Sequence, residues 1–454
     1  MTLLVTVFAF AVALGCLIVV HEFGHYLVAR WCNVKVLRFS VGFGKPLWRK
    51  SLGPDRTEWA IAAFPLGGYV KMLDEREGEV PAAELPRAFN RQPVFKRIAI
   101  VVAGPAANFL LAIAIYWILF VHGVPGFKPT LGAPPPATAA AVAGFTAGET
   151  IVKIGNEEIK TWQDVRWVLL QHAVQKTVAL VEVRNAKGEI ARHKLDTSGL
   201  AASDLDGDFV RALGLIRYRP PLKAVIGEVV GASPAERAGL KAGDEVIAVD
   251  GRAIDHWEQL VAAVRQSPGH RLALEVRRGG VQLPISLIPA TVTENGRAVG
   301  KIGAAPLIDR SLLQEQLTEV RYGPLSGVTM AVSKTWDTAL FSLKMLGKMI
   351  VGEVSLKNLS GPITIADYAG QSAQGGWISY LFFLALISIS LGVLNLLPIP
   401  LLDGGHLMYY MLEVFKGSPV SDEAIEVGQR VGMALLFILM AFALYNDINR
   451  LISG

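Results

Sequence analysis

Long runs of uncharged, mostly apolar residues occur four times along the 454-residue chain. The runs are Met1 to Val20, Ile98 to Val121, Tyr368 to Leu402 and Val431 to Asn446. A helix needs about 20 apolar residues to cross the hydrocarbon core of a bilayer, and the last run is the only short one. The pattern predicts a polytopic α-helical membrane protein with transmembrane helices at residues 1–29, 98–121, 377–402 and 429–448. The membrane core is therefore expected in two parts, residues 1–121 and 368–454.

The segment between the first two runs carries much of the positive charge. Residues 30–97 contain 13 Lys and Arg residues, which by the positive-inside rule indicates a cytoplasmic location. Both chain ends and the region from about 122 to 367 are then expected on the outer side of the membrane, which in a Gram-negative cell is the periplasm.

The outer region contains an internal repeat. The residues Ala143-Gly144-Phe145-Thr146-Ala147-Gly148-Glu149 align with Ala238-Gly239-Leu240-Lys241-Ala242-Gly243-Asp244 at a constant offset of 95. Each copy continues into an apolar strand, a second turn and a helix, an arrangement that resembles the PDZ domain. We expect two tandem PDZ-like α+β domains, at residues 127–219 and 221–305, which either bind the C-terminal ends of peptides or act as spacers.

The segment 322–367 mixes large apolar side chains with lysines such as Lys334, Lys344 and Lys348. This composition is typical of an amphipathic helix lying on the membrane surface, in contact with lipid. Packing of the same helix against the membrane spans explains the pattern equally well.

Composition narrows the class of protein. Hydrophobic residues make up 52% of the chain and charged residues 18%, which fits a protein that is partly solvated by lipid. The net charge of +5 suggests nucleic acid only weakly, because the chain has no basic cluster interleaved with aromatic residues. We therefore expect no nucleic-acid partner.

Candidate metal chemistry lies at the end of the first run, in the sequence His21-Glu22-Phe23-Gly24-His25. Residues four apart on a helix share a face, so His21 and His25 can converge on one Zn²⁺. Glu22 lies beside them and can act as a general base toward a water molecule. Ionisable groups inside a membrane are costly unless they pair or bind something, which strengthens the metal interpretation.

A catalytic zinc needs a third protein ligand, and we expect it from the end of the third run. Asp403 offers a carboxylate there, and His406 is an alternative ligand. Pro398 and Pro400 break the helix just before Asp403 and free backbone groups that suit a watery or protein-lined cavity. Asn395 either donates a hydrogen bond to a substrate carbonyl or holds two helices together.

The cytoplasmic segment also contains strand patterns, and we expect a β-hairpin at residues 35–74. Its turn sequences Gly42-Phe43-Gly44 and Gly67-Gly68-Tyr69-Val70 are either ordinary hairpin turns or loops that bind substrate. Because the hairpin follows the candidate metal helix directly, we favour substrate binding.

Together, HExxH in the first span, Asn395-x-x-Pro-x-Pro-x-Leu-Asp403-Gly-Gly in the third, Gly104-Pro105-x-x-Asn108 in the second and the two PDZ-like repeats resemble the site-two family of intramembrane zinc proteases. The resemblance implies one Zn²⁺ per chain held by His21, His25 and Asp403, with Glu22 as the base. It implies cleavage of single-pass membrane proteins, such as an anti-sigma factor in the sigma-E envelope stress response, and of remnant signal peptides. It also implies a bacterial inner-membrane location, periplasmic PDZ-like domains that filter substrates by size, and an active site near the cytoplasmic side.

Two other functions are compatible with some of these residues, a transporter or channel and a membrane scaffold. Ionisable residues within spans also mark transporters and channels, but the chain shows no repeated membrane half. A PDZ-bearing membrane scaffold with a structural metal site would need a closed set of four ligands, and the sequence offers no fourth ligand nearby.

Overall fold

The computed structural model describes residues 2–200, 208–294, 297–307, 310–354 and 361–453. These residues form two compact units. The first unit comprises Met1–Val124, Leu200–Phe209 and Glu319–Gly454, and the second comprises Pro125–Gly199 and Val210–Thr318.

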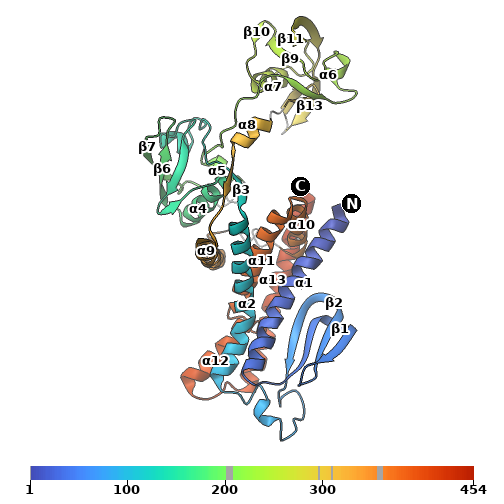
Figure 1. Cartoon of the computed structure of the whole chain (residues 1–454), viewed down its shortest axis with the longest axis vertical. Coiled ribbons are helices and arrows are strands. Elements are labelled where there is room, and N and C mark those ends of the chain that lie inside the picture. Colours follow the sequence, from blue (N-terminus) through green and yellow to red (C-terminus); the bar gives the residue numbers. More distant parts are fainter. Residues whose placement is uncertain (1, 201–207, 295–296, 308–309, 355–360, 454) are drawn as a thin grey trace. The chain divides into compact units, whose positions relative to one another are not determined.

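Helices dominate the first unit (Figure 1). Its helices are α1 (Thr2–Trp31), the 3₁₀ turn η1 (Leu85–Arg87), α2 (Val94–His122), α9 (Pro324–Ile350), α10 (Pro362–Gln374), α11 (Trp377–Leu396), α12 (Asp403–Lys416) and α13 (Asp422–Ser453). Within the described residues, four helices are long and apolar enough to cross a membrane: α1, α2, α11 and α13. The number of expected spans is therefore confirmed.

The third span is shorter than the sequence pattern predicts. Helix α11 ends at Leu396, so residues 397–402 of the expected span 377–402 lie outside it. Leu397 has an extended backbone because Pro398 follows it, and the helical region is sterically disfavoured for the residue before a proline. The chain then turns and starts again as α12 at Asp403.

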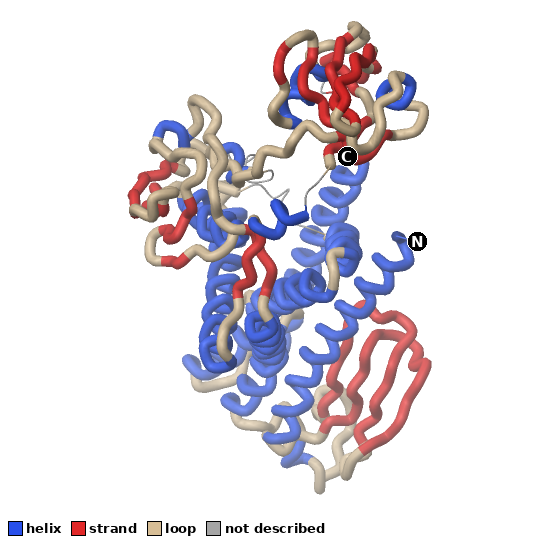
Figure 2. Tube along the Cα trace, turned by 45° about the horizontal axis from the view of Figure 1, so that its top comes forward, coloured by secondary structure: helices blue, strands red, loops and turns tan. Residues whose placement is uncertain are grey.

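The β-hairpin expected at residues 35–74 forms a sheet beside α1 (Figure 2). Strands β1 (Val36–Leu52) and β2 (Thr57–Met72) are both bent, so that each contributes two rows to the sheet, with a row of the other strand between them. The order across the sheet is 68–72, 36–41, 57–62 and 46–52. Residues 68–72 pair only with β1 among the described residues, which leaves their other edge open.

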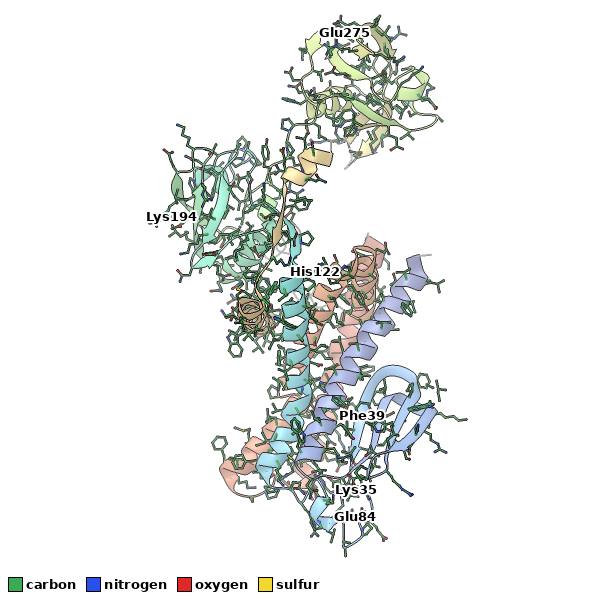
Figure 3. All side chains as sticks on the ribbon, in the orientation of Figure 1. Lys35, Phe39, Glu84, His122, Lys194 and Glu275 are labelled. Carbon is green, nitrogen blue, oxygen red and sulfur yellow. The ribbon has the colours of Figure 1, made fainter. Side chains whose placement is uncertain are left out.

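An ion pair ties the start of this sheet to the loop that leads to α2. The Lys35 ammonium donates to the Glu84 carboxylate at 2.5 and 2.7 Å (Figure 3). The hairpin and the following loop are thus held together beside the end of α1.

Helix α9 packs against the membrane spans with one face and exposes apolar side chains on the other. It is seen end on in Figure 1, beside the lengthwise α2, and the Trp117 indole N–H of α2 donates to the Pro324 carbonyl at 2.9 Å. Small residues, among them Gly327, Ala331 and Thr335, lie on its buried face. Trp336 on the other face is exposed. The helix therefore packs on the spans and also presents apolar side chains to its surroundings.

A buried carboxylate joins the last span to α10. Both oxygens of Asp447 in α13 accept hydrogen bonds from the N-terminus of α10, from the amides of Gly361, Ile363 and Thr364 and from the Thr364 hydroxyl. A helix N-terminus leaves unpaired N–H donors and favours a negative charge, so this contact satisfies several donors at once.

The second unit contains the repeat in structural form. Sheet β5-β4-β6-β7 and sheet β10-β9-β11-β12 place their strands in the same order relative to the sequence. One helix follows the second strand of each sheet along the chain, α4 in the first copy and α7 in the second. The elements are β3 (Val124–Phe127), α3 (Ala139–Val142), β4 (Thr150–Ile154), β5 (Glu157–Glu158), α4 (Trp162–Gln175), β6 (Val178–Arg184), β7 (Ile190–Asp196), α5 (Phe209–Ala212), β8 (Ile226–Val229), α6 (Pro234–Arg237), β9 (Glu245–Val249), β10 (Arg252–Ala253), α7 (Trp257–Arg265), β11 (Leu272–Arg278), β12 (Val281–Leu287), β13 (Ala290–Glu294), β14 (Arg297–Lys301), β15 (Ala304–Pro306), α8 (Arg310–Glu315) and β16 (Leu317–Val320).

Candidate metal centre

Helix α1 presents both histidines of the HExxH sequence on one face. His21 and His25 are each only 9% exposed, and their Nε2 atoms lie 3.3 Å apart. The helix continues past them to Trp31, so the i, i+4 spacing is realised as the sequence predicted.

Asp403 enters from the start of α12. The preceding loop folds tightly against the first turn of that helix, where a Cβ on Gly404 would lie 2.1 Å from the Leu397 carbonyl oxygen and one on Gly405 would lie 2.5 Å from that of Ile399. Only glycine fits at these two positions. The Asp-Gly-Gly sequence is therefore required for the turn that places the carboxylate.

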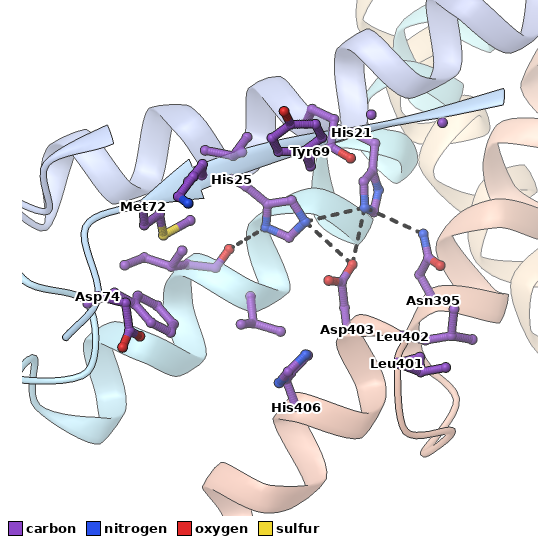
Figure 4. Close-up of a pocket in the computed structure, with 18 of the residues that line it drawn as sticks. His21, His25, Tyr69, Met72, Asp74, Asn395, Leu401, Leu402, Asp403 and His406 are labelled. Atoms are coloured by element: carbon purple, nitrogen blue, oxygen red, sulfur yellow. Dashed lines mark hydrogen bonds and ion pairs between the residues drawn. The ribbon is translucent and has the colours of Figure 1, made fainter. Parts of the chain in front are cut away.

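The three side chains meet in a small triangle (Figure 4). The Oδ2 atom of Asp403 lies 3.2 Å from His21 Nε2 and 3.5 Å from His25 Nε2. A tetrahedral zinc with bonds of about 2.0–2.1 Å sets its ligand atoms about 3.3–3.4 Å apart. Asp403 Oδ2 is also buried without a hydrogen-bond partner among the described residues. The spacing and the unsatisfied oxygen both fit a Zn²⁺ ion.

The far sides of both imidazoles are held by α2. His25 Nδ1 lies 2.8 Å from the Ile100 carbonyl oxygen, and His21 Nδ1 lies 3.2 Å from the Asn108 amide nitrogen. Partners on the far nitrogen orient a metal-binding imidazole and select its tautomer. The motif Gly104-Pro105-x-x-Asn108 marks Asn108 in the sequence, but its spacing does not reveal this contact with His21.

Glu22 and the open sheet edge share one cavity with the triangle. The cavity has a volume of about 1220 Å³ and is lined by residues of α1, α12 and the β2 segment from Gly67 to Met72. A Cβ on Gly68 would lie 2.9 Å from Glu22 Cγ, so the strand backbone lies directly against the candidate base. Tyr69 and Val70 line the same cavity, as does Phe43, whose ring occupies the space where a Gly67 side chain would go.

Asn395 and His406 occupy different positions around the triangle. The Asn395 amide nitrogen lies 3.5 Å from His21 Nε2. His406 lines the cavity one turn further along α12 but is outside the group of ligand atoms formed by His21, His25 and Asp403. Burial lowers the pKa of the His406 imidazole, which favours its neutral form.

Gly104 on α2 leaves the room that the two rings occupy. A Cβ at this position would lie 2.2 Å from His25 Nε2 and 2.9 Å from His21 Cε1. In Gly104→Ala we therefore expect the rings to be displaced, zinc to be bound more weakly, and cleavage to fall about 100-fold, as for misplacements of about 1 Å in other sites. Zinc content and cleavage of a membrane substrate test this expectation. Gly15→Ala is the control, because its Cβ would meet nothing within 4 Å. Equal behaviour of the two variants would contradict it.

Comparison with known proteins shows the family of this chain. Residues 9–439 match the family model described as Peptidase family M50. A relative from Ralstonia nicotianae, which carries the name zinc metalloprotease, is 46% identical over 99% of both chains. Regulator of sigma-E protease RseP is 45% identical in Salmonella typhimurium and 43% identical in Escherichia coli, over 98% of this chain and of each relative. The chain belongs to peptidase family M50, and it is an integral membrane zinc metalloprotease.

Proposed function

We propose that this protease hydrolyses peptide bonds within the membrane-spanning segments of single-pass membrane proteins, using His21, His25 and Asp403 as zinc ligands and Glu22 as the general base. The observation that carries the proposal is the ligand triangle, which opens into a cavity shared with Glu22 and an unpaired strand edge. A closed structural site would need a fourth ligand. Within the described part of the chain, the group of mutually close ligand atoms has three members, which argues against a scaffold.

The side chains around the triangle have distinct roles in hydrolysis. A bound Zn²⁺ would supply a Lewis acid for a carbonyl oxygen and lower the pKa of a water molecule. Glu22 takes the proton from the attacking water and passes it to the leaving nitrogen. The Asn395 amide donates a hydrogen bond to the oxygen of the scissile carbonyl as negative charge develops there.

The open edge of β2 provides hydrogen-bond partners for a substrate helix that unwinds. A peptide bond in a membrane helix is protected by its own hydrogen bonds, and an unwound segment needs new partners in an environment that lacks water. On the edge away from β1, residues 68–72 offer backbone groups next to Glu22 that pair with no other strand in the described part of the chain. A substrate strand that pairs with this edge keeps its hydrogen bonds while its backbone passes the base.

Pairing of a substrate strand with β2 predicts which proline substitution in this strand impairs cleavage. The Leu73 N–H donates to the Lys35 carbonyl, and N–H groups alternate in direction along a strand, so the Tyr69 N–H faces β1 and the Val70 N–H faces the open edge. We expect Val70→Pro, which removes one pairing donor, to impair cleavage of stable substrate helices more than of helices that contain helix-breaking residues. Val70→Ala keeps the donor and is the control. Equal impairment of both substrate types by Val70→Pro would count against strand pairing. Tyr69→Pro removes a donor that faces β1, so it should disrupt the sheet itself and impair cleavage of both substrate types.

The relatives suggest the biological substrate. Two of them are named for regulation of sigma-E, so we assign this chain a substrate of the anti-sigma factor type in the sigma-E stress response. The resemblance of its motifs to the site-two family adds remnant signal peptides as substrates and a bacterial inner-membrane location. The 13 basic residues of segment 30–97 support a cytoplasmic hairpin and an active site near that side. The exposed apolar face of α9 supports lipid contact at the membrane surface.

The outer region carries the second part of the proposal. The matching strand orders of its two sheets support a pair of PDZ-like domains, at 127–219 and 221–305. As periplasmic domains they would exclude substrates with bulky outer parts or capture peptide ends. The sheet edges suit extended peptides, because strand addition is a common mode of PDZ recognition.

One experiment tests the central proposal. The purified full chain is incubated with single-pass membrane proteins, with and without a zinc chelator, and fragments are measured by mass spectrometry. We expect cleavage within the spanning segment, its loss on chelation and its return on addition of Zn²⁺. Cleavage that is insensitive to chelation, or confined to segments outside the membrane, would refute the proposal.

A further inference from the structure

Asn108 lies where three helices meet behind the ligand triangle. It is fully buried on α2, with its amide nitrogen 3.2 Å from His21 Nδ1 of α1. The Ser388 hydroxyl of α11 donates to its backbone carbonyl at 2.7 Å. His21 Nε2, on the opposite side of the ring, faces Asp403 at 3.2 Å. Asn108 is therefore the side chain that contacts the far nitrogen of a proposed zinc ligand.

The tautomer of His21 decides what this contact must do. A neutral imidazole carries one hydrogen, so a ring that binds metal through Nε2 carries it on Nδ1 and needs an acceptor there. Asn108 Oδ1 is a buried acceptor without a hydrogen-bond partner among the described residues. A half turn of the carboxamide exchanges Oδ1 and Nδ2 with little change in shape. Oδ1 then accepts from the His21 Nδ1–H, which satisfies the buried acceptor and the imidazole donor, and Nδ2 takes the position that Oδ1 leaves.

The two histidines differ in what their Nδ1 atoms face: His25 faces a backbone carbonyl, whereas His21 faces a side chain. His25 Nδ1 lies 2.8 Å from the backbone carbonyl of Ile100, which can only accept a hydrogen bond. The backbone thus sets the metal-binding tautomer of His25. His21 faces no such carbonyl in the contacts described for it, and its tautomer depends on the amide of Asn108.

We infer that Asn108 is a positioning residue that holds His21 with its Nδ1 protonated, so that Nε2 is available to Zn²⁺. This inference rests on the zinc site of the proposed function and adds to it a partner behind the ligand. Outer partners of metal-binding histidines typically contribute about 10–100-fold to metal affinity. The contribution should appear in zinc binding itself, whether or not a substrate is cleaved.

The test measures zinc affinity of the full-length protein in detergent, by competition with a metal-sensitive dye. All variants are made in the Glu22→Gln background, so that the readout is independent of catalysis. Asn108→Leu keeps the branched shape of the side chain but removes the acceptor, and we expect its zinc affinity to fall about 10–100-fold. Asn108→Asp keeps an acceptor and should rescue affinity to within about threefold of the Asn108 parent, because a carboxylate can only accept. Thermal unfolding of the metal-free variants checks that the fold is intact.

Ser388→Ala is the matched control, because it removes a buried hydroxyl from the same place without touching the Asn108 amide. Its zinc affinity should stay within about threefold of the parent if the amide carries the effect. Unchanged affinity in Asn108→Leu would overturn the inference. So would an Asn108→Asp variant as weak as Asn108→Leu, because the position would then serve packing alone. Zinc binding that depends on Asn108, together with a wild-type protein that cleaves no membrane substrate, would instead refute the proposed function and leave this inference standing.

Discussion

Glu22→Gln should keep its zinc and lose its activity. The side chain lies against the β2 backbone at Gly68 and lines the cavity beside the triangle, but it is outside the group of ligand atoms. Glutamine has nearly the same shape as glutamate but cannot accept a proton from water. Because general acid–base catalysis contributes typically about 10²–10⁴-fold, we expect the cleavage rate to fall by about that factor.

Two measurements separate this role from a structural one. Zinc content, measured by atomic absorption on the purified variant, should remain at the wild-type value, and thermal unfolding should be unchanged. Glu22→Asp, which retains a carboxylate on a shorter arm, should recover part of the activity. Cleavage by Glu22→Gln at close to the wild-type rate, or loss of zinc from it, would contradict the assignment.

Asp403→Ala should lose both metal and activity. The carboxylate is one of three ligand atoms that lie within 4.8 Å of one another, and its removal leaves two histidines on a single helix. The loss in zinc affinity should exceed the roughly 10–100-fold that follows removal of an outer partner. Zinc content and cleavage of a membrane substrate are the two readouts.

His406→Ala is the control for Asp403→Ala, because His406 lies on the same helix and in the same cavity but outside the triangle. We expect it to retain zinc. The reverse result, with zinc lost from His406→Ala and kept by Asp403→Ala, would show that the histidine is the third ligand and that the assignment of Asp403 is wrong.

The sequence predicted the membrane helices well because their signal is local. A run of about 20 apolar residues has few alternatives, and the four runs correspond to α1, α2, α11 and α13. The ends were predicted less well. The end of α11 depends on Pro398, and α13 extends into a polar segment that begins at Asp422 and gives no hydropathy signal.

For the β-hairpin, the sequence predicted the location of the strands but not their pairing. Strand patterning located residues 35–74, and β1 and β2 occupy residues 36–52 and 57–72. Patterning could not show that each strand bends and pairs twice, since that depends on long-range register. The open edge at residues 68–72 is a product of that register.

The sequence alone determined the chemistry that local geometry controls: the shared helix face of His21 and His25, the position of Glu22 beside them and the break before Asp403. Only the tertiary structure decided the rest, because it depends on contacts between elements that are distant in the chain. It brings Asp403 to within 3.2 Å of His21, uses Gly104 to make space for both rings, and sets Asn108 behind one of them. The motif Gly104-Pro105-x-x-Asn108 marks these two residues but not their roles, since each role depends on what packs against the residue.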